Sequence, residues 1–177
     1  VIMYNIVLYY TSSTGCTSRS LLLKAIEKHY GISEDKLELV HEYGRKPYFA
    51  SHPDIHFSIS HSGDIWGVVF SDNEVGLDMQ YPNPSVAQEK IAKRYFHPDE
   101  YRAFLDGENF YYIWTRKEAV CKLFGYGIDA RFPKINTYAQ EFESFTFAVK
   151  TVMPISDNFP YYSIASGADF VYNSIKF

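Results

Sequence analysis

The chain has 177 residues, of which 46% are hydrophobic and 21% charged, a composition typical of a soluble globular protein of one domain or two small lobes. Its 17 basic and 21 acidic residues give a net charge of −4, which argues against a large nucleic-acid-binding face because such faces are basic. No apolar stretch is long enough to span a bilayer. Neither a nucleic acid nor a membrane is therefore an expected partner.

The two cysteines, Cys16 and Cys121, lie far apart and match neither a disulfide framework nor a zinc or redox motif. They are typical of a protein in a reducing compartment, and we expect a cytoplasmic location. The opening ten residues lack the basic start of a signal peptide. Met3 is a candidate natural start, with Val1 and Ile2 as additions.

The first half of the chain predicts one helix among several strands. Apolar spacing and β-branched runs predict a strand at 3–10, a helix at 18–30 that ends at Gly31, and strands at 37–41, 56–60, 65–71 and 74–80. Residues 44–56 are expected to form a loop. Turn-forming residues at 62–64 and 71–73 separate the last three strands, so these strands are predicted to form an antiparallel meander.

The second half begins after a break at 81–85, where two prolines interrupt the chain. Helices are predicted at 85–95, 98–106 and 108–124, and strands at 145–149 and 161–165. Each half thus combines helix with antiparallel strands. The expected fold class is α+β, with an N-terminal lobe at 1–81 and a C-terminal lobe at 82–177.

A first motif is Phe57-Ser58-Ile59-Ser60-His61-Ser62-Gly63. Alternation on a strand places Ser58 and Ser60 on one face and Phe57 on the other. Hydroxyls, an imidazole and backbone N–H groups at a strand end can bind an anion. Taken alone, an ordinary turn in which His61 caps a carbonyl explains the motif better.

A second motif is Val75-Gly76-Leu77-Asp78-Met79-Gln80. Asp78 and Gln80 lie two residues apart on a predicted strand, so their side chains share a face. A carboxylate beside an amide oxygen suits a hard cation such as Mg²⁺. A solvated polar face of an antiparallel strand is the commoner explanation.

A third motif lies on the helix predicted at 108–124, where Trp114, Glu118 and Lys122 follow one another at four-residue spacing. Glu118 and Lys122 form an ordinary stabilising pair in the simplest interpretation. Trp114 beside them favours partial burial over a fully solvated face. The three motifs together suit a metal-held pyrophosphate flanked by cations.

The order of these motifs, preceded by Gly44-Arg45-Lys46-Pro47 and ending in Trp114-Thr115-Arg116-Lys117-Glu118-Ala119, resembles the Sfp-type 4'-phosphopantetheinyl transferases over about residues 17–130. The resemblance implies a pseudo-dimer of two similar α+β lobes with coenzyme A in the cleft between them. It implies transfer of the 4'-phosphopantetheine arm to a serine of an acyl or peptidyl carrier protein. Adenosine 3',5'-bisphosphate would be released, with Mg²⁺ or alternatively Mn²⁺ on the pyrophosphate.

The resemblance also assigns roles to individual residues. The implied metal ligands are Asp78, Glu118 and Gln80. The implied catalytic residues are Glu118 as the base for the serine hydroxyl, Lys122 on the pyrophosphate, and Asp78. The implied coenzyme A contacts are Lys46 at the 3'-phosphate, Ser60, His61, Arg19 and Lys122. Lys117 is expected to point elsewhere and to play a supporting role.

The chain departs from the family pattern in two respects that bear on the site. Many relatives carry a carboxylate where Gln80 stands, so the metal would be held less strongly here. Residues 1–16 contain no Lys or Arg, although relatives often place basic residues ahead of the first helix. These departures motivate an alternative, a catalytically degenerate relative that binds coenzyme A or a carrier protein. A generic nucleotide phosphohydrolase is a third hypothesis.

A carrier protein is typically acidic, so an acidic transferase needs a local basic or apolar docking strip. The candidates for this strip are Arg94, Arg102 and Arg116, with those of the aromatic residues Tyr95, Phe96 and Tyr101 that are exposed. A solvated helix face with a few core aromatics explains these residues equally well. We expect the protein to act as a monomer, because a pseudo-dimer supplies both lobes from one chain.

Overall fold

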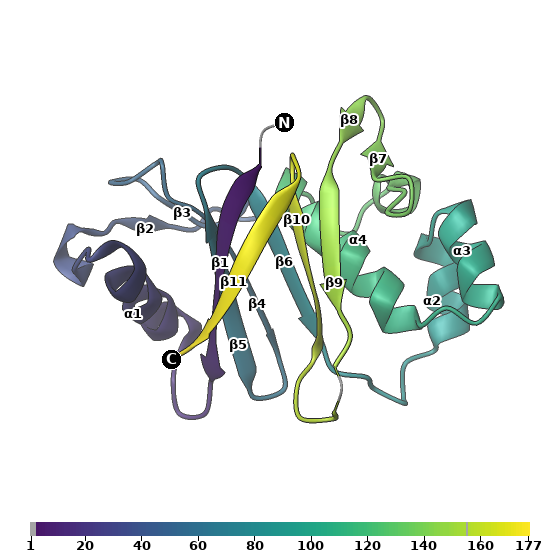
Figure 1. Cartoon of the computed structure of the whole chain (residues 1–177), viewed down its shortest axis with the longest axis horizontal. Coiled ribbons are helices and arrows are strands. Elements are labelled where there is room, and N and C mark those ends of the chain that lie inside the picture. The colour runs from purple at the N-terminus through teal and green to yellow at the C-terminus, as the bar shows by residue number, and fades with distance from the viewer. Residues whose placement is uncertain (1–2, 155) are drawn as a thin grey trace.

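The computed structural model describes residues 3–154 and 156–177, so the expectation about Val1 and Ile2 lies outside the described residues. Two sheets form the centre of the molecule, with helices on the outer side of each (Figure 1). The α+β class predicted from the sequence is confirmed. No helix among the described residues is both long and apolar enough to cross a membrane.

The first sheet has four strands. In spatial order they are β11 (Phe170–Lys176), β1 (Tyr4–Ser12), β5 (Ile65–Ser71) and β4 (His56–Ser62). β1 runs parallel to β11 and antiparallel to β5, and β4 and β5 form a hairpin. Helix α1 (Ser18–Tyr30) lies where the apolar spacing predicted it. Thr17 accepts a hydrogen bond from the backbone of Ser20 at its start, and Gly31 ends it in the left-handed conformation, φ 69°.

The second sheet has three strands and is covered by the longest helix. Its strands, in spatial order, are β6 (Val75–Gln80), β10 (Tyr161–Ser166) and β9 (Ala148–Val152). Helix α4 (Phe110–Phe124) packs against this sheet, with Asn109 as its N-cap and Gly125 as its C-cap. Helices α2 (Gln88–Tyr95) and α3 (Pro98–Leu105) lie beyond α4 (Figure 1).

Short elements complete the fold. They are the hairpin of β2 (Leu39–Val40) and β3 (Tyr48–Phe49), the hairpin of β7 (Glu141–Phe142) and β8 (Phe145–Thr146), and the 3₁₀ turns η1 (Glu34–Lys36) and η2 (Phe132–Lys134). The loop predicted at 44–56 therefore contains β3. The strand predicted at 145–149 is instead divided between β8 and β9.

The predicted meander of three strands is wrong at its third member. β6 does not extend the β4–β5 hairpin but pairs antiparallel with β10. In the same way β11, which the sequence analysis did not assign, joins β1 in the first sheet. Strand pairing thus crosses residue 81 in both directions. The division into lobes at 1–81 and 82–177 remains a prediction, and the hydrogen-bonded sheets do not follow it.

Serine side chains of β4 connect the two sheets where backbone pairing is missing. The hydroxyls of Ser58, Ser60 and Ser62 accept hydrogen bonds of 3.0, 3.0 and 2.8 Å from the backbone N–H groups of Leu77, Met79 and Tyr81. Because side chains alternate along a strand, three serines at two-residue spacing all face β6. This serine ladder satisfies N–H groups along the edge of β6 that is not hydrogen-bonded to the backbone of another strand.

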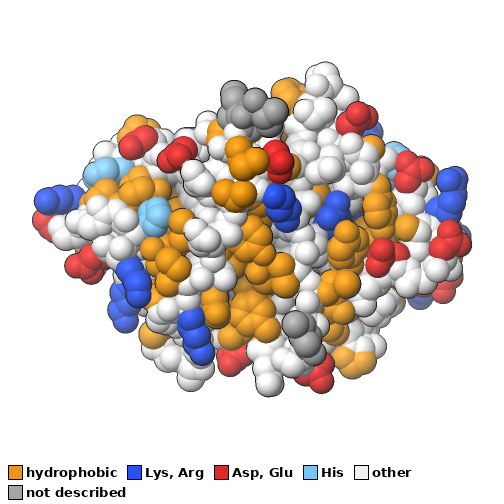
Figure 2. Space-filling view, viewed as in Figure 1, with side chains coloured by type: hydrophobic (Ala, Val, Ile, Leu, Met, Phe, Trp, Pro, Cys, Tyr) orange, Lys and Arg blue, Asp and Glu red, His pale blue; other side chains and the backbone are white. Residues whose placement is uncertain are grey.

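Three hydrophobic clusters fill the spaces between the layers of helices and sheets. One lies between α1 and the first sheet and includes Leu22, Ile26 and Val68; another lies between α4 and the second sheet. The third joins Leu8 of the first sheet to Leu77 and other residues of the second. On the face drawn in Figure 2, hydrophobic side chains also gather over the central strands. The core thus holds α4 against β6, where the candidate site lies.

Candidate active site

Helix α4 approaches β6 so closely that only glycine fits between them. A Cβ atom placed on Gly76 would lie 1.9 Å from the backbone oxygen of Ala119. This contact brings the second half of α4 alongside the β6 residues that follow Gly76. Asp78 of β6 and Glu118 and Lys122 of α4, which the sequence grouped by motif, consequently share one site.

Asp78 is the centre of this site and is buried, with 3% of its surface exposed. Its Oδ1 atom lies 2.8 Å from the Lys122 Nζ, and Ser60 donates its hydroxyl hydrogen to the same oxygen at 3.2 Å. Its Oδ2 accepts a hydrogen bond of 3.3 Å from the Gln80 amide nitrogen. Both carboxylate oxygens are therefore already oriented by neighbouring side chains.

Glu118 is the second acidic residue of the site. It is partly buried, and no hydrogen-bond partner for its carboxylate is present among the described residues. Burial, reinforced by the nearby Asp78 charge and only partly offset by Lys122, raises the pKa of Glu118 to about 7. A carboxyl group with a pKa near neutrality can accept a proton from a hydroxyl and release it again.

The donor set fits a divalent cation with oxygen ligands. The Asp78 and Glu118 carboxylates repel each other, and a bound cation would relieve this repulsion. The Gln80 side-chain amide lies beside Asp78 and could add a further ligand. No group of three or more His, Cys, Asp or Glu side chains suited to a metal occurs in the described part of the chain. A magnesium site here would thus rest on two carboxylates, an amide and ligands from the substrate.

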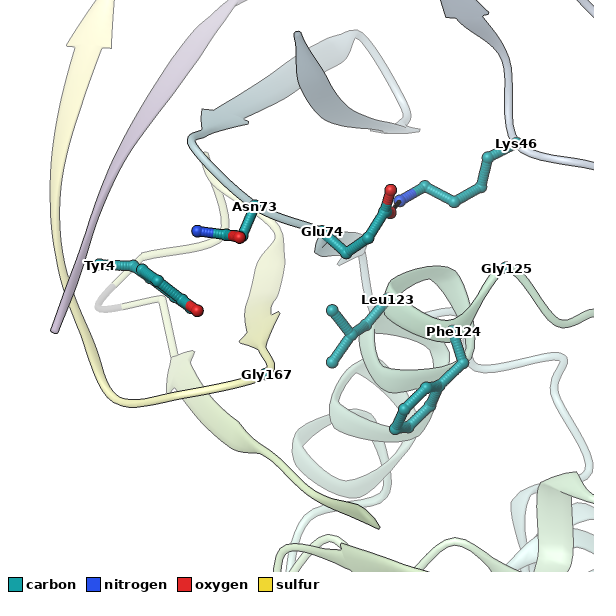
Figure 3. A pocket seen from close by; sticks show the side chains of 8 residues that line it. All are labelled: Tyr4, Lys46, Asn73, Glu74, Leu123, Phe124, Gly125 and Gly167. Carbon is teal, nitrogen blue, oxygen red and sulfur yellow. Dashed lines mark hydrogen bonds and ion pairs between the residues drawn. The ribbon is translucent and has the colours of Figure 1, made fainter. Parts of the chain in front are cut away.

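Lys46 lies at the other end of β6, beside two cavities. Its Nζ is 2.7 Å from a Glu74 carboxylate oxygen and donates a 3.0 Å hydrogen bond to the Val75 carbonyl. A cavity of about 590 Å³ lies between this pair and the end of α4; its lining residues are Tyr4, Lys46, Asn73, Glu74, Leu123, Phe124, Gly125 and Gly167 (Figure 3). The Asp78 cluster does not line this cavity.

Two predicted coenzyme A contacts, His61 and Arg19, form no side-chain hydrogen bond or ion pair with the Asp78 cluster among residues 3–154 and 156–177. His61 is exposed, and as the residue after Ser60 on β4 it points to the opposite face of the strand. Arg19 lies at the start of α1, where its guanidinium is 3.9 Å from Glu34. The structure therefore brings together Asp78, Gln80, Glu118, Lys122 and Ser60, but it does not bring His61 or Arg19 into contact with them.

Lys117 points away from the site, as its position next to Glu118 predicted. Its Nζ lies 2.8 Å from Glu100 of α3, donates to the backbone oxygen of Ile135, and is fully buried. Glu100 in turn accepts hydrogen bonds from the backbone and hydroxyl of Thr137. This pair connects α4 to α3 and to the loop before β7, so Lys117 supports the helix that carries Glu118.

Arg116 of the predicted docking strip is buried, which corrects that prediction, and Phe96 is not among the exposed aromatic residues. Arg116 is 8% exposed; its guanidinium lies over the Tyr112 ring and donates to the Thr137 backbone oxygen. Phe96 is 5% exposed and packs with Phe110. Arg116 is among the buried residues of α4, and Phe96 directly follows the end of α2. The other members are exposed or partly buried: Arg94, Arg102, Tyr95 and Tyr101.

Sequence reasoning missed Glu74 and His56. The Glu74 carboxylate lies 3.0 Å from the His56 Nδ1 as well as 2.7 Å from the Lys46 Nζ. The sequence does show both residues next to motifs: Glu74 directly precedes Val75-Gly76-Leu77-Asp78, and His56 directly precedes the motif that begins at Phe57. Their pairing depends on β4 and β6 lying side by side, which the predicted meander did not place correctly.

Comparison with known proteins matches residues 74–164, which include β6, α4 and the Asp78 cluster, to the 4'-phosphopantetheinyl transferase superfamily. The chain belongs to this superfamily. Sequence analysis predicted this membership, and it is confirmed.

Individual relatives of this chain have the same family name. A 4'-phosphopantetheinyl transferase of Bacillus subtilis is 37% identical over 116 residues, which are 61% of this chain and 50% of the relative. The transferase Sfp of Bacillus subtilis strain 168 is 32% identical over 115 residues, with the same coverage. The transferase AcpT of Salmonella typhi is 30% identical over 134 residues, 67% of this chain and 69% of the relative. The chain thus spans about half the length of the first two transferases.

Proposed function

We propose that this chain transfers the 4'-phosphopantetheine arm of coenzyme A to a serine hydroxyl of an acyl or peptidyl carrier protein. The observation that carries the proposal is the cluster of Asp78, Lys122 and Glu118, held together by the α4–β6 contact in a member of this superfamily. The relatives named above are transferases of this kind.

The reaction forms a bond between the serine oxygen and the β-phosphorus of coenzyme A and breaks the bond from that phosphorus to the bridging oxygen. Adenosine 3',5'-bisphosphate leaves with that oxygen. Catalysis of such a transfer rests mainly on positioning and on neutralising charge. Lys122, released from Asp78 by the incoming pyrophosphate, supplies a positive charge to it. Glu118 accepts the serine proton.

A divalent cation, Mg²⁺ or alternatively Mn²⁺, would be held by Asp78, Glu118 and the Gln80 amide, and would neutralise the pyrophosphate oxygens when bound. Before a ligand enters, the chain's own residues hold the site in order: Ser60 and Gln80 orient the Asp78 carboxylate. Lys46 is the proposed contact to the phosphate on the ribose, where that phosphate would compete with the Glu74 carboxylate now paired with Lys46. His61 and Arg19 remain proposed phosphate contacts, and their side chains would have to move toward a bound ligand to make these contacts.

Because Asp78 and Glu118 belong to one chain, we propose that the monomer is active. The predicted cytoplasmic location stays a prediction. The exposed free thiol of Cys16 is compatible with a reducing compartment.

The decisive experiment is intact-mass spectrometry of an apo carrier protein after incubation with this protein, coenzyme A and Mg²⁺. We expect a gain of one phosphopantetheine mass that disappears when Mg²⁺ is chelated. Coenzyme A binding without any gain across fatty-acid, polyketide and non-ribosomal peptide carriers would contradict the proposal and support a catalytically degenerate relative. Release of adenosine bisphosphate without a carrier would support a phosphohydrolase.

Glu118→Gln tests the assigned base. We expect transfer to fall by about 10²-fold or more, since the amide cannot accept the serine proton, while the fold is kept. Glu27→Gln is the matched control, because Glu27 is an exposed acid on α1 far along the chain from the cluster. Equal transfer by the two variants would overturn the role assigned to Glu118.

A further inference from the structure

The Glu74 carboxylate bridges two basic side chains that the sequence separates widely. One oxygen lies 2.7 Å from the Lys46 Nζ, and the other lies 3.0 Å from the His56 Nδ1. Glu74 itself is 59% exposed. Burial alone would raise the pKa of Glu74, but the hydrogen bonds and charges of Lys46 and His56 lower it below its usual value. The carboxylate is thus ionised and occupies the space between its two partners.

This cluster stands between two cavities, which both include Lys46 and Glu74 in their walls. The cavity of about 590 Å³ extends toward the end of α4, and a second of about 240 Å³ extends toward His56 and Phe57. Figure 3 shows the Lys46 side chain reaching across to Glu74 at the rim of the first cavity. An anionic group entering either cavity meets a lysine that is already neutralised.

The position of the cluster along β6 relates it to the proposed substrate. Lys46 also donates to the Val75 carbonyl, three residues before Asp78, and three residues of strand span about 10 Å. If the Asp78 cluster holds the pyrophosphate of coenzyme A, the remaining anionic group is the phosphate monoester on the ribose. Lys46 and His56 are the basic groups beside this end of β6 that could contact the ribose phosphate.

We propose that Glu74 occupies the place of the ribose phosphate and makes this chain accept donors that lack it. A carboxylate repels a phosphate monoester but accepts a hydrogen bond from a free ribose hydroxyl, as acidic residues do in sites that select the unphosphorylated dinucleotide. The substrate class is then a pantetheine donor with or without the 3'-phosphate, including 3'-dephospho-coenzyme A. This inference rests on the proposed function for the placement of the pyrophosphate.

The test is calorimetric titration of coenzyme A and of 3'-dephospho-coenzyme A, with Mg²⁺ and without a carrier protein. We expect wild-type protein to bind the two donors with affinities that differ less than about threefold. Glu74→Gln should tighten binding of coenzyme A roughly tenfold and leave dephospho-coenzyme A unchanged or weaker, since only the first donor carries the repelled charge. Glu42→Gln is the matched control, because Glu42 is an acid of the same region that pairs with Arg45 at 3.0 Å.

An equal change for both donors in Glu74→Gln, or the same selectivity change in Glu42→Gln, would overturn the inference. A strong wild-type preference for coenzyme A would overturn it too. The titration needs no transfer, so its outcome is separate from that of the proposed function. If Glu74→Gln gains selectivity for the 3'-phosphate and no carrier is modified, the inference stands and the proposed function fails.

Discussion

Glu118 shows how one residue acquires its property from its surroundings. On an isolated helix it would be half of an ordinary pair with Lys122, worth about 0.2–0.5 kcal/mol. In the folded chain Lys122 turns instead to Asp78, at 2.8 Å, and leaves Glu118 partly buried beside a second negative charge. Burial, reinforced by the nearby Asp78 charge, raises the pKa of Glu118 to about 7 in the metal-free chain.

The raised pKa of Glu118 predicts a pH dependence of stability. The folded protein binds the Glu118 proton more tightly than the unfolded chain, in which the pKa is close to its usual 4.5. The stabilisation is complete below pH 4.5 and is lost as the pH rises through about 7. In metal-free buffer, the unfolding free energy of wild type relative to Glu118→Gln should therefore fall over this range, by at most about 1.4 kcal/mol per pH unit.

Denaturant unfolding of both proteins between pH 4.5 and 8 measures this difference. Subtracting the variant removes the contributions of the other titrating groups, because they are common to both proteins. A difference that does not change with pH would mean that Glu118 keeps an ordinary pKa. The proposed role as a base near neutrality would then lose its physical support.

At the scale of elements, the contact between α4 and β6 positions the site. The distance of 1.9 Å from a Cβ on Gly76 to the Ala119 backbone oxygen involves backbone on both sides, so no side-chain rotation can relieve it. Gly76→Ala should destabilise the protein by about 1–3 kcal/mol or more, and should reduce transfer further by shifting α4 away from Asp78.

Gly127→Ala is the control for this prediction, since a Cβ there meets no atom within 4 Å and the backbone is not left-handed. Its stability should lie within about 0.5 kcal/mol of wild type. Thermal unfolding of the two variants distinguishes the outcomes. Equal stability of Gly76→Ala and Gly127→Ala would show that α4 does not pack against β6 as described.

At the scale of the whole molecule, each half of the chain contributes a strand that pairs with a strand of the other half. β6 comes from the first half and pairs with β10, whereas β11 ends the chain and pairs with β1. The serine ladder adds side-chain bonds between the sheets. If the second half of the chain unfolds, the first sheet loses β11, and if the first half unfolds, the second sheet loses β6, so we expect one cooperative transition.

The two tryptophans allow this expectation to be tested. Trp66 lies in the core between α1 and the first sheet, and Trp114 on α4 stacks on Phe110. Trp114→Phe leaves a reporter of the first sheet, and Trp66→Phe leaves a reporter beside the second. In each variant, the fluorescence midpoint in urea should coincide with the midpoint from far-UV circular dichroism. Two separate midpoints in either variant would indicate that the halves unfold independently.

The sequence by itself determined the local structure and the membership of the family. Helix α1 covers 18–30 and ends at Gly31 as predicted, because caps and apolar spacing act over a few neighbouring residues. The residue types at Asp78, Glu118 and Lys122, in their order along the chain, indicated the superfamily that residues 74–164 confirm.

Only the tertiary structure decided which strands pair and which side chains meet. The turn at 71–73 is compatible with a hairpin, but the apolar residues of β6 are buried by pairing with β10, a long-range choice that local spacing cannot express. That choice places the serines of β4 against β6 and Glu74 between Lys46 and His56. Tertiary contacts also bury Arg116, whose guanidinium donates hydrogen bonds to Thr137 and Thr151. Pairing and burial depend on contacts between distant segments, and so the chemistry of the site emerged only with the fold.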